Sequence, residues 1–146
     1  MAANPLVSLG SLNLTRASVK FSANPQLNVT PSFLTRAGVT LALNRDATRA
    51  IEVNTGIVPS PEVYIPATVR INLLKTQALS GTWKGQLESN TLIGDFVVRA
   101  DAQGHPPYQF TNGYILNIGE ITTNGSDPTW QAVVGGTYYV NSGMWP

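Results

Sequence analysis

Residues 67–99 read ATVRINLLKTQALSGTWKGQLESNTLIGDFVVR, and this stretch decides the fold. Its first part alternates, with Val69, Ile71 and Leu73 on one side and polar residues on the other. A period of two is typical of a half-buried strand, because successive side chains point to opposite faces of a sheet. The last part, TLIGDFVVR, returns to β character and predicts a second strand.

Between these strands the apolar spacing changes to four. Leu79, Trp83 and Leu87 lie on one face of a helix predicted over about residues 76–89. Because no other segment has a convincing helical pattern, we expect this helix to cover a sheet or an open end of a barrel. Trp83 and its neighbours are also compatible with a ligand pocket, but helix-to-sheet packing is the favoured interpretation of such a stripe.

Composition sets the class of protein. The 146 residues predict one domain, 1–146, with a real core, and 42% of them are apolar. No window of about 18 apolar residues predicts a membrane span, and the first residues do not resemble a secretory signal. The net charge is +1 and the charges are scattered, which argues against a nucleic-acid-binding surface.

The chain has no cysteine, which excludes disulfides, thiolate zinc sites and a cysteine nucleophile. Only 12% of its residues are charged, against about 25% in an ordinary soluble domain. This low share indicates that much of the surface is buried against other subunits. A small neutral β domain is the alternative explanation.

The N-terminal part predicts short elements. Residues 1–17 are rich in Asn, Ser, Gly and Pro and predict an arm. Residues 17–22 alternate and predict a strand, and residues 26–30 predict a second short strand that ends at Pro31.

Residues 38–54 predict a β-hairpin. GVTLALN forms the first strand, with Val39, Leu41 and Leu43 inward, and the returning strand follows a turn at residues 45–48. Residues 55–66 contain three prolines, which cannot donate to a ladder, so this segment predicts a long extended loop. A loop of this length is usually functional or docked on something.

The C-terminal part predicts two long paired strands. Residues 108–124 predict one long strand, or two with a kink or bulge at Asn112-Gly113, and residues 129–142 predict the last strand. Gly135-Gly136 inside the last strand predicts a bulge or a close backbone approach. In sum, we expect a mainly β protein, a barrel or sandwich of about seven or eight strands with one flanking helix.

The sequence shows no pattern of residues that is typical of a catalytic site. His105 is the single histidine and has no partner in sequence for metal or triad chemistry. Asp95 and Asp101 are the one pair considered for a glycosidase, and no sugar-binding aromatic residue lies beside them. The sequence therefore predicts that the chain is not an enzyme and holds no cofactor and no metal.

Tyr138, Tyr139 and Trp145 are candidates for partner contact. Neighbouring tyrosines on a strand face opposite sides, so one can enter the core while the other meets solvent or a partner. Aromatic residues are enriched at interfaces, which makes contact with a partner as plausible as an ordinary surface position.

The central stretch and its flanks resemble the tail tube proteins of contractile-tailed bacteriophages. In that family a strand ending in a TINLLKTQ-like motif is followed by an amphipathic helix, an IGDF strand, a PYxFxN strand and a last strand ending YYxNSxxW. The matching positions cover nearly the whole chain in the right order. They are Ser18-Val19, 25–30, Phe33-Leu34, 71–77, 93–96, Pro107-Tyr108, Phe110, Asn112, 138–142 and Trp145.

Two features depart from the family pattern. Gly135-Gly136 interrupts a strand expected to be more regular, and Gly81 and Gly85 lie inside the helix. Each helix glycine costs about 0.5–1 kcal/mol relative to alanine, and could loosen the helix or permit close packing on a neighbouring subunit.

The resemblance implies a structural function. Six protomers would close into a ring by continuing their sheets side by side, and the rings would stack into a hollow tube inside the sheath. DNA would pass through the tube during ejection without specific binding. The implied partners are further copies of the chain, the tail sheath protein, the tape measure protein, and the baseplate and tail-terminator proteins. The implied location is the virion tail, assembled in the host cytoplasm.

The resemblance and the strand pattern together suggest two sets of residues. Polar positions on alternating strands are the lumen candidates, namely Thr40, Asn44, Glu52, Asn54, Thr68, Arg70 and Asn72. The segment 45–66 is expected to reach the adjacent ring. The candidates for contact between rings or subunits are Arg45, Asp46, Arg49, Ile57, Val58, Pro59, Pro61, Tyr64, Tyr138 and Trp145.

Two alternatives stay open. The hexameric tube protein of bacterial contractile secretion systems shares the fold and the ring implied by the resemblance, and gene neighbours would separate the two. A carbohydrate-binding β-sandwich would instead require exposed aromatic residues on one face and a monomeric or dimeric protein.

Overall fold

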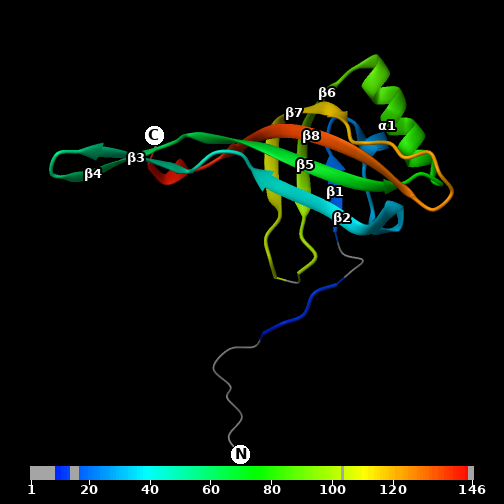
Figure 1. Ribbon diagram of the computed structural model, residues 1–146, viewed down its shortest axis with the longest axis horizontal. Coiled ribbons are helices and arrows are strands. Elements are labelled where there is room, and N and C mark those ends of the chain that lie inside the picture. The colour runs from blue at the N-terminus through cyan, green and yellow to red at the C-terminus, as the bar shows by residue number, and fades with distance from the viewer. Residues whose placement is uncertain (1–8, 14–16, 103, 145–146) are drawn as a thin grey trace, which may run out of the picture.

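The computed structural model describes residues 9–13, 17–102 and 104–144 and has a mainly β fold with one α-helix (Figure 1). Six strands form a curled antiparallel sheet, a half-barrel, in the order β1-β6-β7-β8-β5-β2, and β3 and β4 form a separate sheet. The strands are β1 (Ser18–Phe21), β2 (Leu34–Leu43), β3 (Thr48–Val53), β4 (Gly56–Pro61), β5 (Tyr64–Leu74), β6 (Leu92–Arg99), β7 (Tyr108–Ile118) and β8 (Thr129–Tyr139). The helices are α1 (Ala78–Ser89) and the 3-10 helices η1 (Pro25–Leu27), η2 (Pro31–Phe33) and η3 (Ser142–Met144). The predicted fold class is confirmed.

The strand–helix–strand unit predicted for residues 67–99 is present as β5, α1 and β6. β5 lies between β2 and β8 in the sheet, whereas β6 lies between β1 and β7. The helix begins at Ala78, two positions later than expected, and lies at the end of the sheet remote from β3 and β4 (Figure 1).

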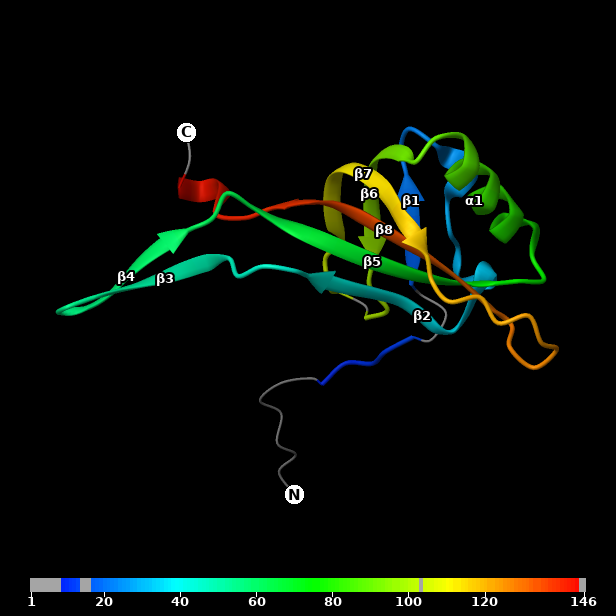
Figure 2. The same ribbon diagram turned by 45° about the horizontal axis from the view of Figure 1, so that its top comes forward.

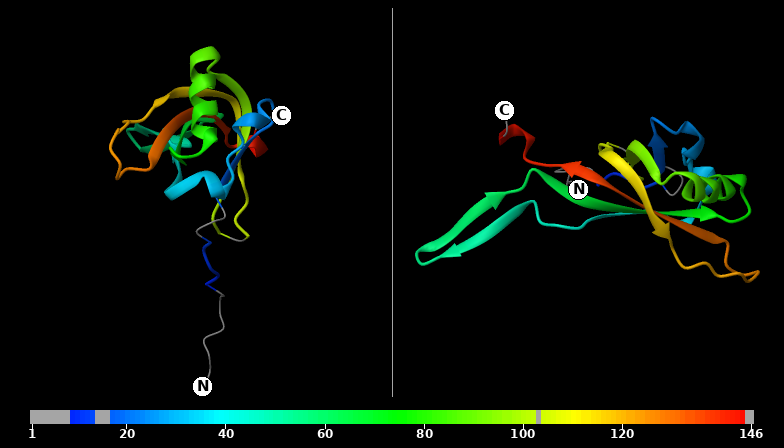
Figure 3. Two further views of the ribbon diagram at one scale, coloured as in Figure 1. Left: turned by 90° about the vertical axis from the view of Figure 1, so that its right-hand side faces the viewer. Right: turned by 90° about the horizontal axis from the view of Figure 1, so that it is seen from above.

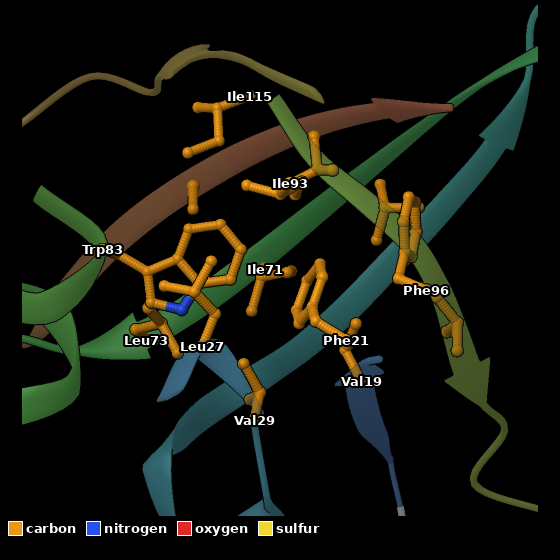
Figure 4. Close-up of a cluster of buried hydrophobic side chains, with 14 of the residues drawn as sticks. Val19, Phe21, Leu27, Val29, Ile71, Leu73, Trp83, Ile93, Phe96 and Ile115 are labelled. Atoms are coloured by element: carbon orange, nitrogen blue, oxygen red, sulfur yellow. The ribbon is translucent and has the colours of Figure 1, made fainter. Parts of the chain in front are cut away.

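The core fills the inside of the curl. Alternate residues of β5, from Ile65 to Leu73, are buried there. Trp83 reaches in from α1 and lies beside Ile71 (Figure 4), and its ring makes a T-shaped contact with Phe21 at 5.2 Å between centroids. Each large side chain removed from water here contributes about 1.5–3 kcal/mol, so the half-barrel has its own source of stability.

The prediction of a short strand at residues 26–30 is wrong. Residues 25–27 form η1, because Pro25 fixes φ at a value suited to a helical turn. Val29 alone bridges to Val19, through backbone hydrogen bonds of 3.0 and 2.7 Å. This segment therefore covers the outer edge of β1.

The predicted pairing within residues 38–54 is also wrong. β2 pairs with β5, and β3 pairs with β4, which starts in the segment predicted as a loop. The connection between β3 and β4 is only two residues long, the length that hairpins favour, whereas residues 44–47 separate β2 from β3. Pro59 and Pro61 are accommodated because each strand of an isolated pair has one unbonded edge.

Glycines in β7 and β8 leave space that close neighbours occupy. A Cβ at Gly113 would meet the carbonyl oxygen of Gly94 at 2.4 Å, and one at Gly135 would meet the Tyr114 ring at 2.6 Å. Asn112 has a φ of 52°, and the register of β7 shifts there, so the predicted bulge at Asn112-Gly113 is confirmed. The bulge or close backbone approach predicted at Gly135-Gly136 is wrong, because β8 pairs regularly with β5 there and the space beside both glycines is filled by aromatic side chains. The strands end earlier than predicted, β7 at Ile118 and β8 at Tyr139.

No described helix is long and apolar enough to cross a membrane.

Candidate assembly surfaces

The β3–β4 hairpin projects from the half-barrel as a two-stranded arm (Figures 2 and 3). All six residues of β3 are exposed, and Ile51, Val53, Ile57 and Val58 keep between 45% and 65% of their surface in solvent. This is the largest group of exposed apolar side chains on any described element pair. The sequence interpretation missed the arm because its alternation was assigned to the wrong partner strand.

Both faces of the hairpin carry apolar side chains. Ile51 lies opposite Val58 in the register, and the next pair along is Glu52 with Ile57. Adjacent pairs face opposite sides of a ribbon, so one face shows Ile51 with Val58 and the other shows Ile57. An isolated two-stranded hairpin is marginally stable in water, which makes a covering partner advantageous to this arm.

A polar hollow lies on the face of β2 and β5 opposite the core. Thr40, Asn44, Thr68 and Arg70 line it together with Ala42, and its volume is about 170 Å³. The Asn44 amide donates to Thr68 Oγ1 at 2.5 Å. Four of the seven lumen candidates are thus brought together on one surface.

The other three lumen candidates lie elsewhere. Asn72 is buried, and its amide joins three strands by donating to Gly38 O at 2.9 Å and accepting from Gln131 Nε2 at 3.0 Å. Glu52 and Asn54 belong to the β3–β4 hairpin and its tip, because β3 does not return along β2. The seven lumen candidates therefore do not share one surface of the subunit.

The interface candidates divide in a similar way. The hairpin and its base carry Arg45, Asp46, Arg49, Ile57, Val58, Pro59, Pro61 and Tyr64. Tyr138 instead points to the core, with its ring 5.5 Å from that of Phe110, while Tyr139 is 55% exposed. Trp145 and most of the arm at residues 1–17 lie outside the described residues.

The two edges of the six-stranded sheet differ. β2, ten residues long, has β5 on one side and no described strand on the other. The β1 edge is occupied in part by the bridge to Val29, and Phe21 N donates to Asn28 Oδ1 at 2.7 Å. An unpaired strand edge can accept a further strand, so β2 is the more open of the two edges.

The loop beyond β7 is held by polar contacts. The Lys75 ammonium donates to Thr122 O, and the Thr129 N–H donates to Asp127 Oδ1 at 3.0 Å. The bond from Thr129, and then the charge of Lys75, lower the pKa of Asp127 from its usual value. Any stabilisation from this carboxylate is complete above the usual aspartate pKa and is lost as the pH falls through the lowered one.

The residues considered for chemistry do not converge. His105 Nε2 lies 2.8 Å from the Tyr108 hydroxyl. Asp95 lies within β6 and accepts from Asn112 N at 3.1 Å, while Asp101 lies beyond the far end of that strand. At about 3.3 Å per residue, a strand holds positions six apart at a distance of about 20 Å, so the carboxylates do not form a pair. Among the described residues no cluster of three or more His, Cys, Asp or Glu side chains could hold a metal.

The fold and these surfaces define a class of small, mainly β protein, a half-barrel with one α-helix, a projecting hairpin and one open sheet edge. No protein-family model matches the sequence, and no curated protein is significantly similar to it.

Proposed function

We propose that this protein is the structural subunit of a phage tail tube, in which hexameric rings stack into a hollow conduit for DNA. The observation that carries the proposal is the β3–β4 hairpin, which exposes apolar side chains on both faces and lies at the end of the long axis opposite α1 (Figure 1). A surface of this kind usually marks contact with another protein.

A second copy of the chain is the partner that the proposal requires. The hairpin is at one end of the molecule, and α1 and residues 119–128 are at the other (Figure 1). A contact between two different surfaces of identical subunits is heterologous and builds rings or filaments. The open β2 edge adds a second contact of the same type, which would continue the sheet from one subunit to the next.

The polar hollow on β2 and β5 supports the lumen assignment. Its side chains are hydroxyls, an amide and the single cation Arg70. DNA-binding proteins owe much of their affinity to several phosphate contacts by Lys and Arg. A lining with few cations would let DNA pass, and the sheath, tape measure, baseplate and terminator proteins are the further partners that this assembly would need.

Electron microscopy tests the proposal directly. Negative-stain images of the purified, concentrated protein should show hollow rings or tubes. Ile57→Asp should leave the subunit folded and abolish stacking, because it places a carboxylate on the apolar arm. Ile57→Val, which keeps the apolar character at the same position, should retain the tubes. A protein that stays monomeric at high concentration, alone and in the presence of tail baseplates, would contradict the proposed function.

A further inference from the structure

Asn141 lies at the base of the hairpin and has no role in the function proposed above. It follows β8 in the segment YYVNS, and its φ of 55° is a left-handed conformation that asparagine tolerates better than most residues. Its Nδ2 donates to Glu62 O at 2.9 Å and to Ala47 O at 3.3 Å. One amide group therefore bonds both chains of the hairpin where they leave the half-barrel.

The backbone around Asn141 adds further bonds. Glu62 N donates to Ala47 O at 2.9 Å, and Val140 N donates to Val63 O at 3.0 Å. We call residues 44–47, 61–64 and 139–141 the hairpin root. The two ends of the hairpin are thus joined at one place to a segment far away in the sequence, residues 139–141, next to η3 (Figure 2).

Arg45 holds another part of the root. Its Nη2 donates to Tyr64 O at 2.6 Å and lies 3.8 Å from the Glu62 carboxylate. Its guanidinium carbon is 4.7 Å from the centre of the Tyr64 ring. A single exposed ion pair stabilises little, but a planar guanidinium held by a carbonyl, a carboxylate and an aromatic ring has one preferred position.

We propose that Asn141 and Arg45 are positioning residues that fix the direction in which the β3–β4 hairpin leaves the half-barrel. A ribbon attached by two short connections would otherwise swing about them. Holding the arm in one direction before contact reduces the ordering entropy lost on association. The benefit for stacking rests on the proposed tail tube function, whereas the fixed direction is a property of the free subunit.

Spin-label distances in the free subunit test this positioning role. The chain has no cysteine, so Thr55→Cys at the hairpin tip and Ser89→Cys at the end of α1 would carry the only two labels. We expect one narrow distance distribution. Asn141→Asp should widen it about twofold, because a carboxylate has no N–H to donate and would face two carbonyl oxygens. Asn54→Asp makes the same change at the tip and should leave the width unaltered.

Arg45 provides a second, independent variant. Arg45→Gln should also widen the distribution, and it decides the matter if Asn141→Asp fails to fold, as judged by circular dichroism. Arg45→Lys should restore the width only in part, since an ammonium lacks the planar fork. Unchanged widths in folded Asn141→Asp and Arg45→Gln would overturn the positioning role.

The same variants separate this inference from the proposed function. A narrow wild-type distribution that widens in Asn141→Asp supports the positioning role even if no tube ever forms. Tubes that assemble normally from variants with unchanged distributions would support the proposed function and overturn the positioning role.

Discussion

The half-barrel and the hairpin contain similar strands but differ in how deeply their apolar side chains are buried. Both consist of antiparallel strands with β-branched residues, yet Val69 and Ile71 in the half-barrel are fully buried while Ile51 and Val58 in the hairpin are about half exposed. The half-barrel curls around Trp83, whereas the hairpin has no layer to pack on within the described residues. Apolar strands therefore indicate burial, but the burying surface can belong to another molecule.

The largest expected effect is in the half-barrel core. Trp83→Ala should lower the free energy of unfolding by about 3–5 kcal/mol, because it removes a fully buried side chain that touches Phe21. Urea unfolding followed by circular dichroism measures the loss. Trp83→Phe should lose less, and a cost below about 1 kcal/mol for the alanine variant would mean that the core does not depend on this contact.

The second largest loss of stability is expected where β6 and β7 lie close together, at Gly113. Gly113→Ala should lower the free energy of unfolding by about 1–3 kcal/mol, since the added methyl group would overlap Gly94 O and the Phe96 ring. The same unfolding measurement applies. Gly125→Ala is the matched control, because a Cβ there meets open space in a loop, and it should be nearly neutral.

A gain in stability is expected on the outer face of α1. Gly81→Ala and Gly85→Ala should each stabilise the subunit by about 0.5–1 kcal/mol, because both positions are exposed and a Cβ meets nothing within 4 Å. Gly38→Ala, also in open space but at a φ of 65°, should destabilise instead. Loss of tubes in a stabilised variant would show that these glycines contact a neighbouring subunit.

The smallest effect on subunit stability should come from the hairpin. Ile51→Thr combined with Val58→Thr should change the free energy of unfolding of the monomer by only about 0.5 kcal/mol, as is usual for exposed positions. The same variant should assemble poorly, which sedimentation would show. A loss of stability comparable to that of Trp83→Ala would mean that the two regions form one cooperative unit.

The apolar periodicity predicted the elements of residues 67–99 well, because the geometry of a strand or a helix alone decides which of their side chains share a face. The alternation of Val69, Ile71 and Leu73 and the spacing of Leu79 and Trp83 match the buried faces of β5 and α1. The glycines of β7 and β8 also indicated close packing, because a residue without a side chain leaves space for a neighbour. The sequence did not show whether that neighbour is a backbone or an aromatic ring.

The sequence did not show which strands pair with one another. Residues 38–54 contain two good strands, and alternation is equally compatible with pairing β2 to β3, or each to another strand. The prolines of residues 55–66 concealed β4 in the sequence, although the two that lie in β4 are compatible with an isolated hairpin, which has edges where proline removes no bond. Asn141 was visible only as part of a motif, because its two acceptors are 79 and 94 residues away.

The order of strands in the sheet has a consequence for synthesis. β8 is the last of the eight strands in the chain, yet it lies in the middle of the sheet, between β7 and β5. Until β8 emerges, the growing polypeptide holds two separate strand groups, each with an additional unsatisfied edge. Such non-local pairing slows folding and leaves edges open to aggregation. The hairpin root also includes residues 139–141, so the nascent chain acquires its projecting arm in final form only after the half-barrel has closed.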